Sequence, residues 1–217
     1  ELLGGLLYLL RTRSDIAYAV GKLAMRAQRA TEKDWSALLR VLAYLFATRT
    51  HGITLRPGSA SPLRLILWVD ASYAIHPDGA SHSGYGLTFV GSTSGLFYSR
   101  SSKQSNVALS STEAELYAAV EATKDALWFR MLLGEIGFPQ DEPTPLNVDN
   151  ASLITLASEF SGNHKRVKHF LVRLNFLINH VDLKNITFLK VPTDDNIVDE
   201  QTKPLGPTQF EHKTKLL

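Results

Sequence analysis

The chain contains no cysteine. A disulfide scaffold, a thiol nucleophile and a cysteine-ligated zinc site are therefore excluded. Long apolar runs are also missing: no stretch approaches the roughly 20 uninterrupted apolar residues of a membrane span, so we expect no membrane partner. An excess of one charge is absent too, since 23 Lys and Arg oppose 21 Asp and Glu. With 44% hydrophobic residues among 217, the chain is too apolar for a disordered coil and long enough for one sizeable core.

The balanced total charge conceals an asymmetry along the chain. Residues 1–57 contain nine Lys and Arg against four Asp and Glu, whereas residues 58–217 contain fourteen against seventeen. A basic front segment fits either a polyanionic partner or the solvated face of helices, and both readings stay open. Because residues 56–62 are rich in Pro, Gly and Ser, we place a boundary there, between a helical segment at 1–57 and a second domain at 63–217. Residue 1 is Glu1 and no signal segment follows it, so we expect a piece of a longer protein.

Capping residues and apolar spacing define the predicted elements. In the front segment, Ser14 or Asp15 is placed to cap one helix, and Thr31 with Asp34 marks the start of a second that ends near His51. In the second domain, Ser110 and Glu113 form a capping box, in which Glu113 is expected to bond back to the Ser110 amide.

The second domain alternates between strand and helix patterns. The predicted strands cover 65–69, 85–90, 95–99, 146–149 and 186–191. The predicted helices cover 110 to about 134–137, 151–158, 165–180 and a last one from about 195 that must break at Pro204. This order predicts an α/β fold with a mixed five-stranded sheet and helices on its faces.

Four carboxylates occupy positions where the local pattern favours apolar residues. Asp70 and Asp149 follow predicted strands, Glu115 lies one turn into the long helix, and Asp199 lies in the first turns of the last helix. Because a buried, unpaired carboxylate costs several kcal/mol, these side chains need a partner, and oxygen ligands without Cys or paired His favour Mg²⁺ or Mn²⁺. Singly, each has an ordinary alternative, since Asp is common in turns and near helix N-termini. Glu113 has the capping role, which makes Glu115 the better ligand candidate without settling the choice.

The same residues carry a resemblance that covers essentially the whole chain. Four stretches resemble the ribonuclease H domain of Ty1/copia-type LTR retrotransposon Pol polyproteins: residues 107–115, residues 69–72 with 83–86, residues 148–150, and residues 191–205. Residues 6–9 and 12–17 are similar to the end of the reverse transcriptase region that precedes this domain. The resemblance implies a ribonuclease H-like sheet, in βββαβαβα order, behind a small helical segment.

The resemblance also implies an activity: Mg²⁺-dependent hydrolysis of the RNA strand of RNA/DNA hybrids during reverse transcription. Asp70 would bridge two Mg²⁺ ions, Glu115 and Asp149 would complete the leaving-group site, and Asp199 the water-activating site, with Mn²⁺ able to substitute. The expected partners are the hybrid and the upstream reverse transcriptase region. The expected location is intracellular, in a cytoplasmic virus-like particle with nuclear access.

Contacts with the hybrid are expected at several positions. Backbone groups of Ala71, Ser72 and Tyr73, with Ser111 and Thr112, are expected to meet the RNA strand, and Asn150 to add a polar contact. The basic stretch with Lys165, Arg166 and Lys168, together with Arg173, fits either a grip on DNA phosphates or a solvated helix start.

Three departures from the family pattern support a second hypothesis, a catalytically quiet or domesticated nucleic-acid-binding or scaffold domain. Leu171 stands where the family usually has an Asp, Ser99 replaces a common Trp, and Glu200-Gln201 replace residues that are more often apolar. An integrase-class enzyme is disfavoured, because its acids follow the order Asp, Asp, Glu, whereas here the order is Asp, Glu, Asp, Asp.

Overall fold

A computed structural model describes residues 1–53, 63–90, 95–158 and 168–214 of the chain. Its centre is a five-stranded sheet with the order β3-β2-β1-β4-β5. The strands are β1 (Leu65–Ser72), β2 (His82–Phe89), β3 (Tyr98–Lys103), β4 (Thr144–Val148) and β5 (Ile186–Lys190). The first three strands pair antiparallel, whereas β4 runs parallel to both β1 and β5. The predicted mixed α/β sheet is therefore confirmed.

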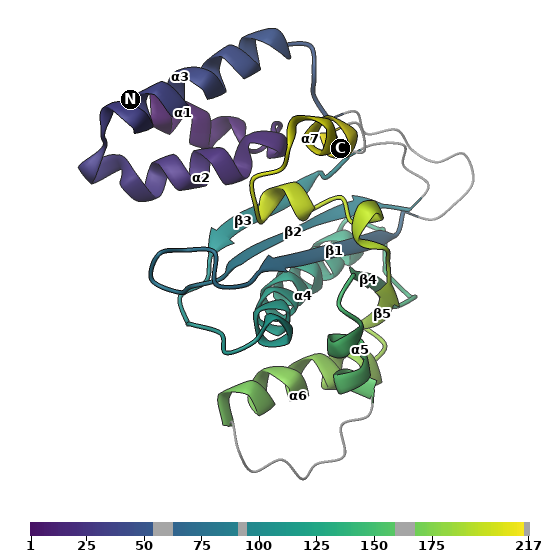
Figure 1. Cartoon of the computed structure of the whole chain (residues 1–217). Helices are drawn as coiled ribbons and strands as arrows, with labels where there is room; N and C mark the ends of the chain where they lie inside the picture. Colours follow the sequence, from purple (N-terminus) through teal and green to yellow (C-terminus); the bar gives the residue numbers. More distant parts are fainter. Residues whose placement is uncertain (54–62, 91–94, 159–167, 215–217) are drawn as a thin grey trace.

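Helices cover both faces of the sheet (Figure 1). They are α1 (Leu2–Leu9), α2 (Ala17–Arg26), α3 (Glu32–Ala47), α4 (Ser111–Glu135), α5 (Ala151–Ser158), α6 (Lys168–Asp182) and α7 (Pro207–Thr214). Two short 3₁₀ turns, η3 (Thr193–Asp195) and η4 (Asp199–Gln201), precede α7, and two more flank α2 at Ser14–Ile16 and Ala27–Arg29. Helices α4, α5 and α6 lie on one side of the sheet, and α1–α3 with η4 and α7 lie on the other. None of the helices in the described part of the chain has the length and apolarity of a membrane span.

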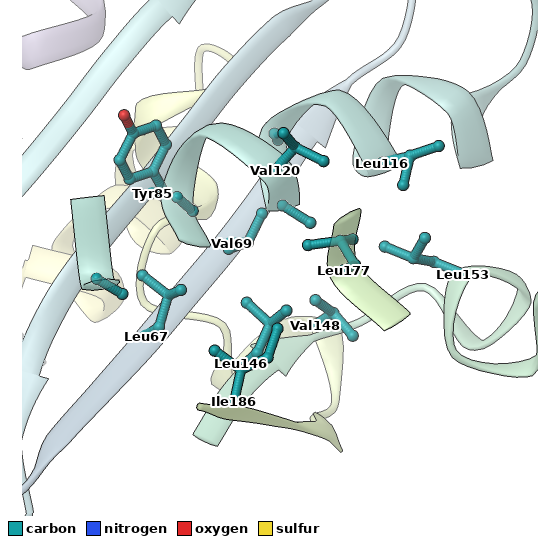
Figure 2. Close-up of a cluster of buried hydrophobic side chains, with 14 of the residues drawn as sticks. Leu67, Val69, Tyr85, Leu116, Val120, Leu146, Val148, Leu153, Leu177 and Ile186 are labelled. Atoms are coloured by element: carbon teal, nitrogen blue, oxygen red, sulfur yellow. The ribbon is translucent and has the colours of Figure 1, made fainter. Parts of the chain in front are cut away.

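The main core lies between the central strands and α4. Figure 2 shows Leu67 and Val69 of β1 and Leu146 and Val148 of β4 in one cluster with Val120 of α4. Strand β1 is apolar from Leu65 to Val69, and β4 is buried at all positions except Pro145, because helices or turns cover both faces of the sheet. Each fully buried Leu or Val contributes about 1.5–3 kcal/mol, so this cluster fixes where β1, β4 and α4 meet.

The front helices form a smaller core of their own. Leu6, Ile16, Val20 and Val41 are buried together there. The predicted Thr31–Asp34 pair is a full capping box at the start of α3. The predicted boundary between residues 57 and 63 lies outside the described residues.

The bounds of three predicted strands need correction, and the second of them begins at His82 rather than Tyr85. Strand β1 does not end at Val69 but continues to Ser72, because β2 pairs with it along its whole length, so Asp70 lies inside a strand opposite Gly84. The third strand starts at Tyr98 and runs to Lys103, later than predicted. It is the edge strand and tolerates polar residues, while Leu96 before it is buried against Ile197 and Val198.

The predicted last helix from about 195 is also wrong. Two 3₁₀ turns occupy this stretch, and the α-helix α7 begins only at Pro207. Asn196 interrupts the helical path with an extended backbone, and its side-chain amide donates to the Val69 carbonyl at 2.8 Å. Gly84 of β2 allows η4 and Thr202 to pack closely on the sheet, since a Cβ at Gly84 would lie 2.6 Å from Thr202 Cγ2.

Candidate metal centre

Three of the four predicted acids converge at one end of β1 and β4. Asp70 comes from β1, Asp149 directly follows β4, and Glu115 lies in the second turn of α4. Each offers a carboxylate oxygen, and these oxygens all lie within 4.8 Å of one another. Because β1 and β4 are neighbouring parallel strands, their ends deliver Asp70 and Asp149 to the same place. The packing of α4 on β1 then brings Glu115 to them.

Glu115 has one oxygen engaged and one without a partner. Its Oε1 accepts a hydrogen bond from the Ala71 amide at 3.2 Å. Its Oε2 is buried and has no hydrogen-bond partner among the described residues. A buried carboxylate oxygen without a partner costs free energy, which a bound cation removes. The donor set consists of oxygens alone, so these residues fit a hard divalent ion such as Mg²⁺.

Ionisation of the two buried acids of the cluster is disfavoured. Burial, opposed by the hydrogen bond from Thr202 and helped by the nearby charges of Asp199 and Asp149, raises the pKa of Asp70 to about 7. Burial likewise raises the pKa of Glu115 well above its ordinary value, helped by Asp70 and Asp149. Such shifts are typical of carboxylates arranged to share cations.

The fourth predicted acid, Asp199, does not join the three-residue group. It opens the η4 turn, is buried, and forms an ion pair with Lys203. Burial lowers the pKa of Lys203, but Asp199, Asp70 and Asp149 outweigh that effect and raise it. Thr202 links the two parts of the site: its hydroxyl hydrogen-bonds both to a carboxylate oxygen of Asp70 and to the Asp199 carbonyl, the latter at 3.0 Å.

The structure separates the roles of the two glutamates of α4. Ser110 caps the helix by accepting the Glu113 amide at 3.1 Å, as predicted. The Glu113 carboxylate, however, accepts the Leu109 amide at 2.7 Å and the Tyr117 hydroxyl at 3.0 Å, and not the Ser110 amide. Glu113 therefore supports the helix start, and Glu115 is the glutamate that belongs to the acidic cluster.

Sequence relatives cover almost the whole chain. It is 34% identical over 212 residues, 97% of its length, to the retrovirus-related Pol polyprotein from transposon RE2 of Arabidopsis thaliana. It is 36% identical over 210 residues to the corresponding polyprotein from transposon TNT 1-94 of Nicotiana tabacum. It is also 42% identical over 128 residues, 58% of this chain and 86% of the other, to the secreted RxLR effector protein 161 of Plasmopara viticola. Over almost its whole length, the chain is therefore similar to one part of the retrovirus-related Pol polyproteins of plant transposons.

The domain spans only 14% and 15% of the two polyproteins, respectively. No family model matches it. Among solved structures, a foamy viral protease–reverse transcriptase in complex with an RNA/DNA hybrid aligns with 94% of this chain and 27% of that one, with a TM-score of 0.50 and 16% identity. At this identity the likeness shows the fold alone.

The predicted hybrid-contact residues of the domain lie around the acids. Ala71 and Ser72 end β1 directly after Asp70, and Tyr73 beyond them is half exposed. Ser111 and Thr112 form the first turn of α4. The Asn150 side-chain oxygen accepts the Leu153 amide at 3.1 Å, so this residue also caps α5. Lys165 and Arg166 lie outside the described residues, as does the side chain of Lys168 in the first turn of α6.

A basic hollow of about 240 Å³ was not predicted from the sequence. Of its lining residues, only Arg173 was considered there, as part of a basic stretch. The hollow lies between β3, the loop that follows it, α4 and α6. Arg100, Lys103 and Arg173 line it, together with Tyr117, whose ring lies 4.2 Å from the Arg173 guanidinium carbon, and Glu121. The signal available in the sequence was the stretch Arg100–Lys103, where basic residues alternate with Ser near the helix that carries Glu115.

Proposed function

We propose that this domain is an endoribonuclease that hydrolyses the RNA strand of RNA/DNA hybrids with two Mg²⁺ ions during reverse transcription. The observation that carries the proposal is the convergence of Asp70, Glu115 and Asp149 within 4.8 Å, with the Glu115 Oε2 buried and unpartnered among the described residues. Sequence similarity supports it, because relatives over nearly the full chain are Pol polyproteins. No Ser, His or Cys nucleophile is required for this chemistry.

The four acids would hold the metal ions, with Mn²⁺ as a substitute. Asp70 would bind both ions, Glu115 and Asp149 the one on the leaving-group side, and Asp199 the one on the water side. When bound, the ions supply a nucleophilic water at neutral pH and stabilise the leaving oxygen.

The chain's own groups prepare this site. The Ala71 amide orients Glu115, and the Thr202 hydroxyl orients Asp70. The positive charge of Lys203, which is paired with Asp199, offsets part of the repulsion among the acids.

Substrate recognition would follow the shape and the phosphates of the hybrid rather than its base sequence. The stretch Ala71–Tyr73, in which Tyr73 is exposed, and the first turn of α4, with Ser111 and Thr112, would meet the RNA strand beside the acids. The basic hollow lined by Arg100, Lys103 and Arg173 would hold phosphates. The upstream reverse transcriptase region would be the second partner, inside a cytoplasmic particle.

Cleavage of an end-labelled RNA/DNA hybrid tests the proposal. In Mg²⁺ or Mn²⁺ the RNA strand should be cut, whereas EDTA, an Asp149→Asn variant, and RNA/RNA or DNA/DNA duplexes should give no cutting. A domain that binds the hybrid but never cuts it in either metal would contradict the proposal and favour the catalytically quiet alternative, which the departures at Ser99 and Leu171 first suggested.

A further inference from the structure

A chain of polar side chains crosses from the front helices to the turn that carries Asp199. On α2, Lys22 Nζ lies 3.2 Å from His76 Nδ1, and His76 Nε2 lies 3.0 Å from His82 Nδ1. His82 Nε2 lies 2.9 Å from the Ser101 hydroxyl on β3, which donates to the Gln201 carbonyl at 2.7 Å. These five residues are called the polar chain below.

The geometry allows one proton arrangement. The Gln201 carbonyl has no proton to give, so the Ser101 hydroxyl donates to it and must accept from His82 Nε2–H. His82 Nδ1 then accepts from His76 Nε2–H, and His76 Nδ1 accepts from the Lys22 ammonium. Every contact is satisfied with both imidazoles neutral. This agrees with burial, which lowers the pKa of His82 to about 3 and also lowers that of His76, each helped by neighbouring positive charge.

At one end, the polar chain holds the η4 turn. Gln201 closes the three-residue turn that Asp199 opens. Among the described residues, the Gln201 side-chain amide makes no hydrogen bond, so its polar link to β3 runs through its backbone carbonyl. The next residue, Thr202, bonds to both Asp70 and Asp199. A shift of the Gln201 carbonyl therefore moves Asp199 and the Asp70 contact together.

At the other end, the polar chain begins on the front helical segment. The Tyr18 ring of α2 packs edge-on against His82, with ring centroids 5.1 Å apart. Lys22 lies one turn further along the same helix and supplies the charge that orients His76. Both imidazoles are buried, His82 to 1% exposure and His76 to 6%, so solvent does not replace Lys22 or Ser101 as partners easily.

We propose that the polar chain positions Asp199 for metal binding, which makes the front helical segment a working part of the metal centre. Lys22, His76, His82 and Ser101 are positioning residues, since they act on Asp199 only through the η4 backbone. The inference rests on the proposed function in one respect, that Asp199 binds a metal ion.

Mn²⁺ affinity of the full 217-residue chain, measured by isothermal titration, tests this. Ser101→Val removes the hydroxyl. Ser101→Thr introduces a side chain of the same shape as valine but keeps the hydroxyl. The Val variant should bind Mn²⁺ about tenfold more weakly, as is typical when a group that orients a ligand is lost, and the Thr variant should bind like the wild type. Lys22→Met should weaken binding in the same direction, while Lys33→Met, at an exposed lysine on α3, should not.

Hydrogen exchange of the amides of residues 199–202 and urea unfolding complete the test. Exchange should be faster in Ser101→Val and Lys22→Met than in their two controls. If Ser101→Val and Lys22→Met lower the unfolding free energy but leave Mn²⁺ affinity unchanged, the polar chain has only a structural role and the inference is overturned. Unchanged exchange of the amides of residues 199–202 in these variants would also overturn it. Absence of Mn²⁺ binding by the wild type would instead contradict the proposed function, and the exchange data would still show whether the polar chain holds the turn.

Discussion

At the scale of single residues, the site places charge where the fold would be more stable without it. Asp70 and Glu115 are both almost fully buried, and no cation of the chain pairs directly with either among the described residues. Lys203, the nearest cation, is paired with Asp199. Such a cluster is costly to fold, and a bound divalent ion would offset that cost.

This cost gives a prediction for Glu115. In EDTA at pH 8, Glu115→Gln should melt about 2–4 °C above the wild type, because it removes a buried carboxyl group whose ionisation the site disfavours. Added Mg²⁺ should raise the melting temperature of the wild type and leave the variant almost unchanged. Thermal melts with and without Mg²⁺ measure both effects.

Glu113→Gln is the matched control on the same helix. It weakens the bonds to the Leu109 amide and the Tyr117 hydroxyl, so it should lower the melting temperature and keep the Mg²⁺ response. The opposite result, a Mg²⁺ response lost in Glu113→Gln and kept in Glu115→Gln, would show that the wrong glutamate has been assigned.

Sequence reasoning identified the acids but not their surroundings. Asp70, Glu115 and Asp149 were predicted because strand ends and a helix start are local patterns. The bond from Thr202 to Asp70 joins residues 132 positions apart and depends on how η4 packs over β2, which no local pattern encodes. Glu200 illustrates the difference: burial, followed by the charge of Asp15, raises its pKa to about 8, so it is largely uncharged at neutral pH.

At the scale of elements, the position of the η4 turn depends on the absence of a side chain at Gly84 of β2. A Cβ at Gly84 would lie 2.6 Å from Thr202 Cγ2, 3.0 Å from Gln201 Cβ and 3.2 Å from the Val198 carbonyl. The turn lies within the stretch that sequence patterns predicted as a helix. That prediction failed because contacts with β1 and β2, and not helical periodicity, shape residues 193–202.

We therefore expect Gly84→Ala to push η4 away from the sheet. The variant should lose about 1–3 kcal/mol of unfolding free energy and about tenfold in Mn²⁺ affinity, since overpacking displaces Asp199. Urea unfolding and metal titration measure the two losses. Gly134→Ala, where no atom lies within 4 Å of the added Cβ, should gain about 0.5–1 kcal/mol and bind Mn²⁺ normally. Equal behaviour of the two variants would contradict the tight packing of η4.

At the scale of the whole molecule, the front helices and the sheet are joined through buried histidines. His82 is in contact with His76, Ser101 and Tyr18, and charged groups that act on the pair are Lys22, Lys103 and Asp78. Sequence patterns predicted the helical segment and the sheet separately. Their junction was not predictable, because Lys22 and His76 are 54 residues apart and neither has a distinctive local context.

This junction predicts a pH dependence of stability. Because burial lowers the pKa of His82 to about 3, this histidine binds a proton below about pH 6.5 in the unfolded chain but stays neutral in the folded chain until the pH approaches 3. The stabilisation is thus present above pH 6.5 and is lost as the pH falls towards 3. Between pH 7.5 and 5.5, the wild type should lose about 1 kcal/mol more than His82→Gln does. Urea unfolding at the two pH values measures this, and parallel losses in both proteins would refute it.

The central claim is that four acids of this chain, and not their acidic neighbours, carry a metal-dependent ribonuclease H activity. Single-turnover cleavage of an RNA/DNA hybrid in Mg²⁺ tests it most directly, with Asp70→Asn, Glu115→Gln, Asp149→Asn, Asp199→Asn and the control Glu113→Gln compared at one temperature. We predict that each of the four loses at least about 100-fold in rate, and that Glu113→Gln stays within about threefold of the wild type. Cleavage at the wild-type rate by any of the four, or an inactive wild type that still binds the hybrid, would contradict the account.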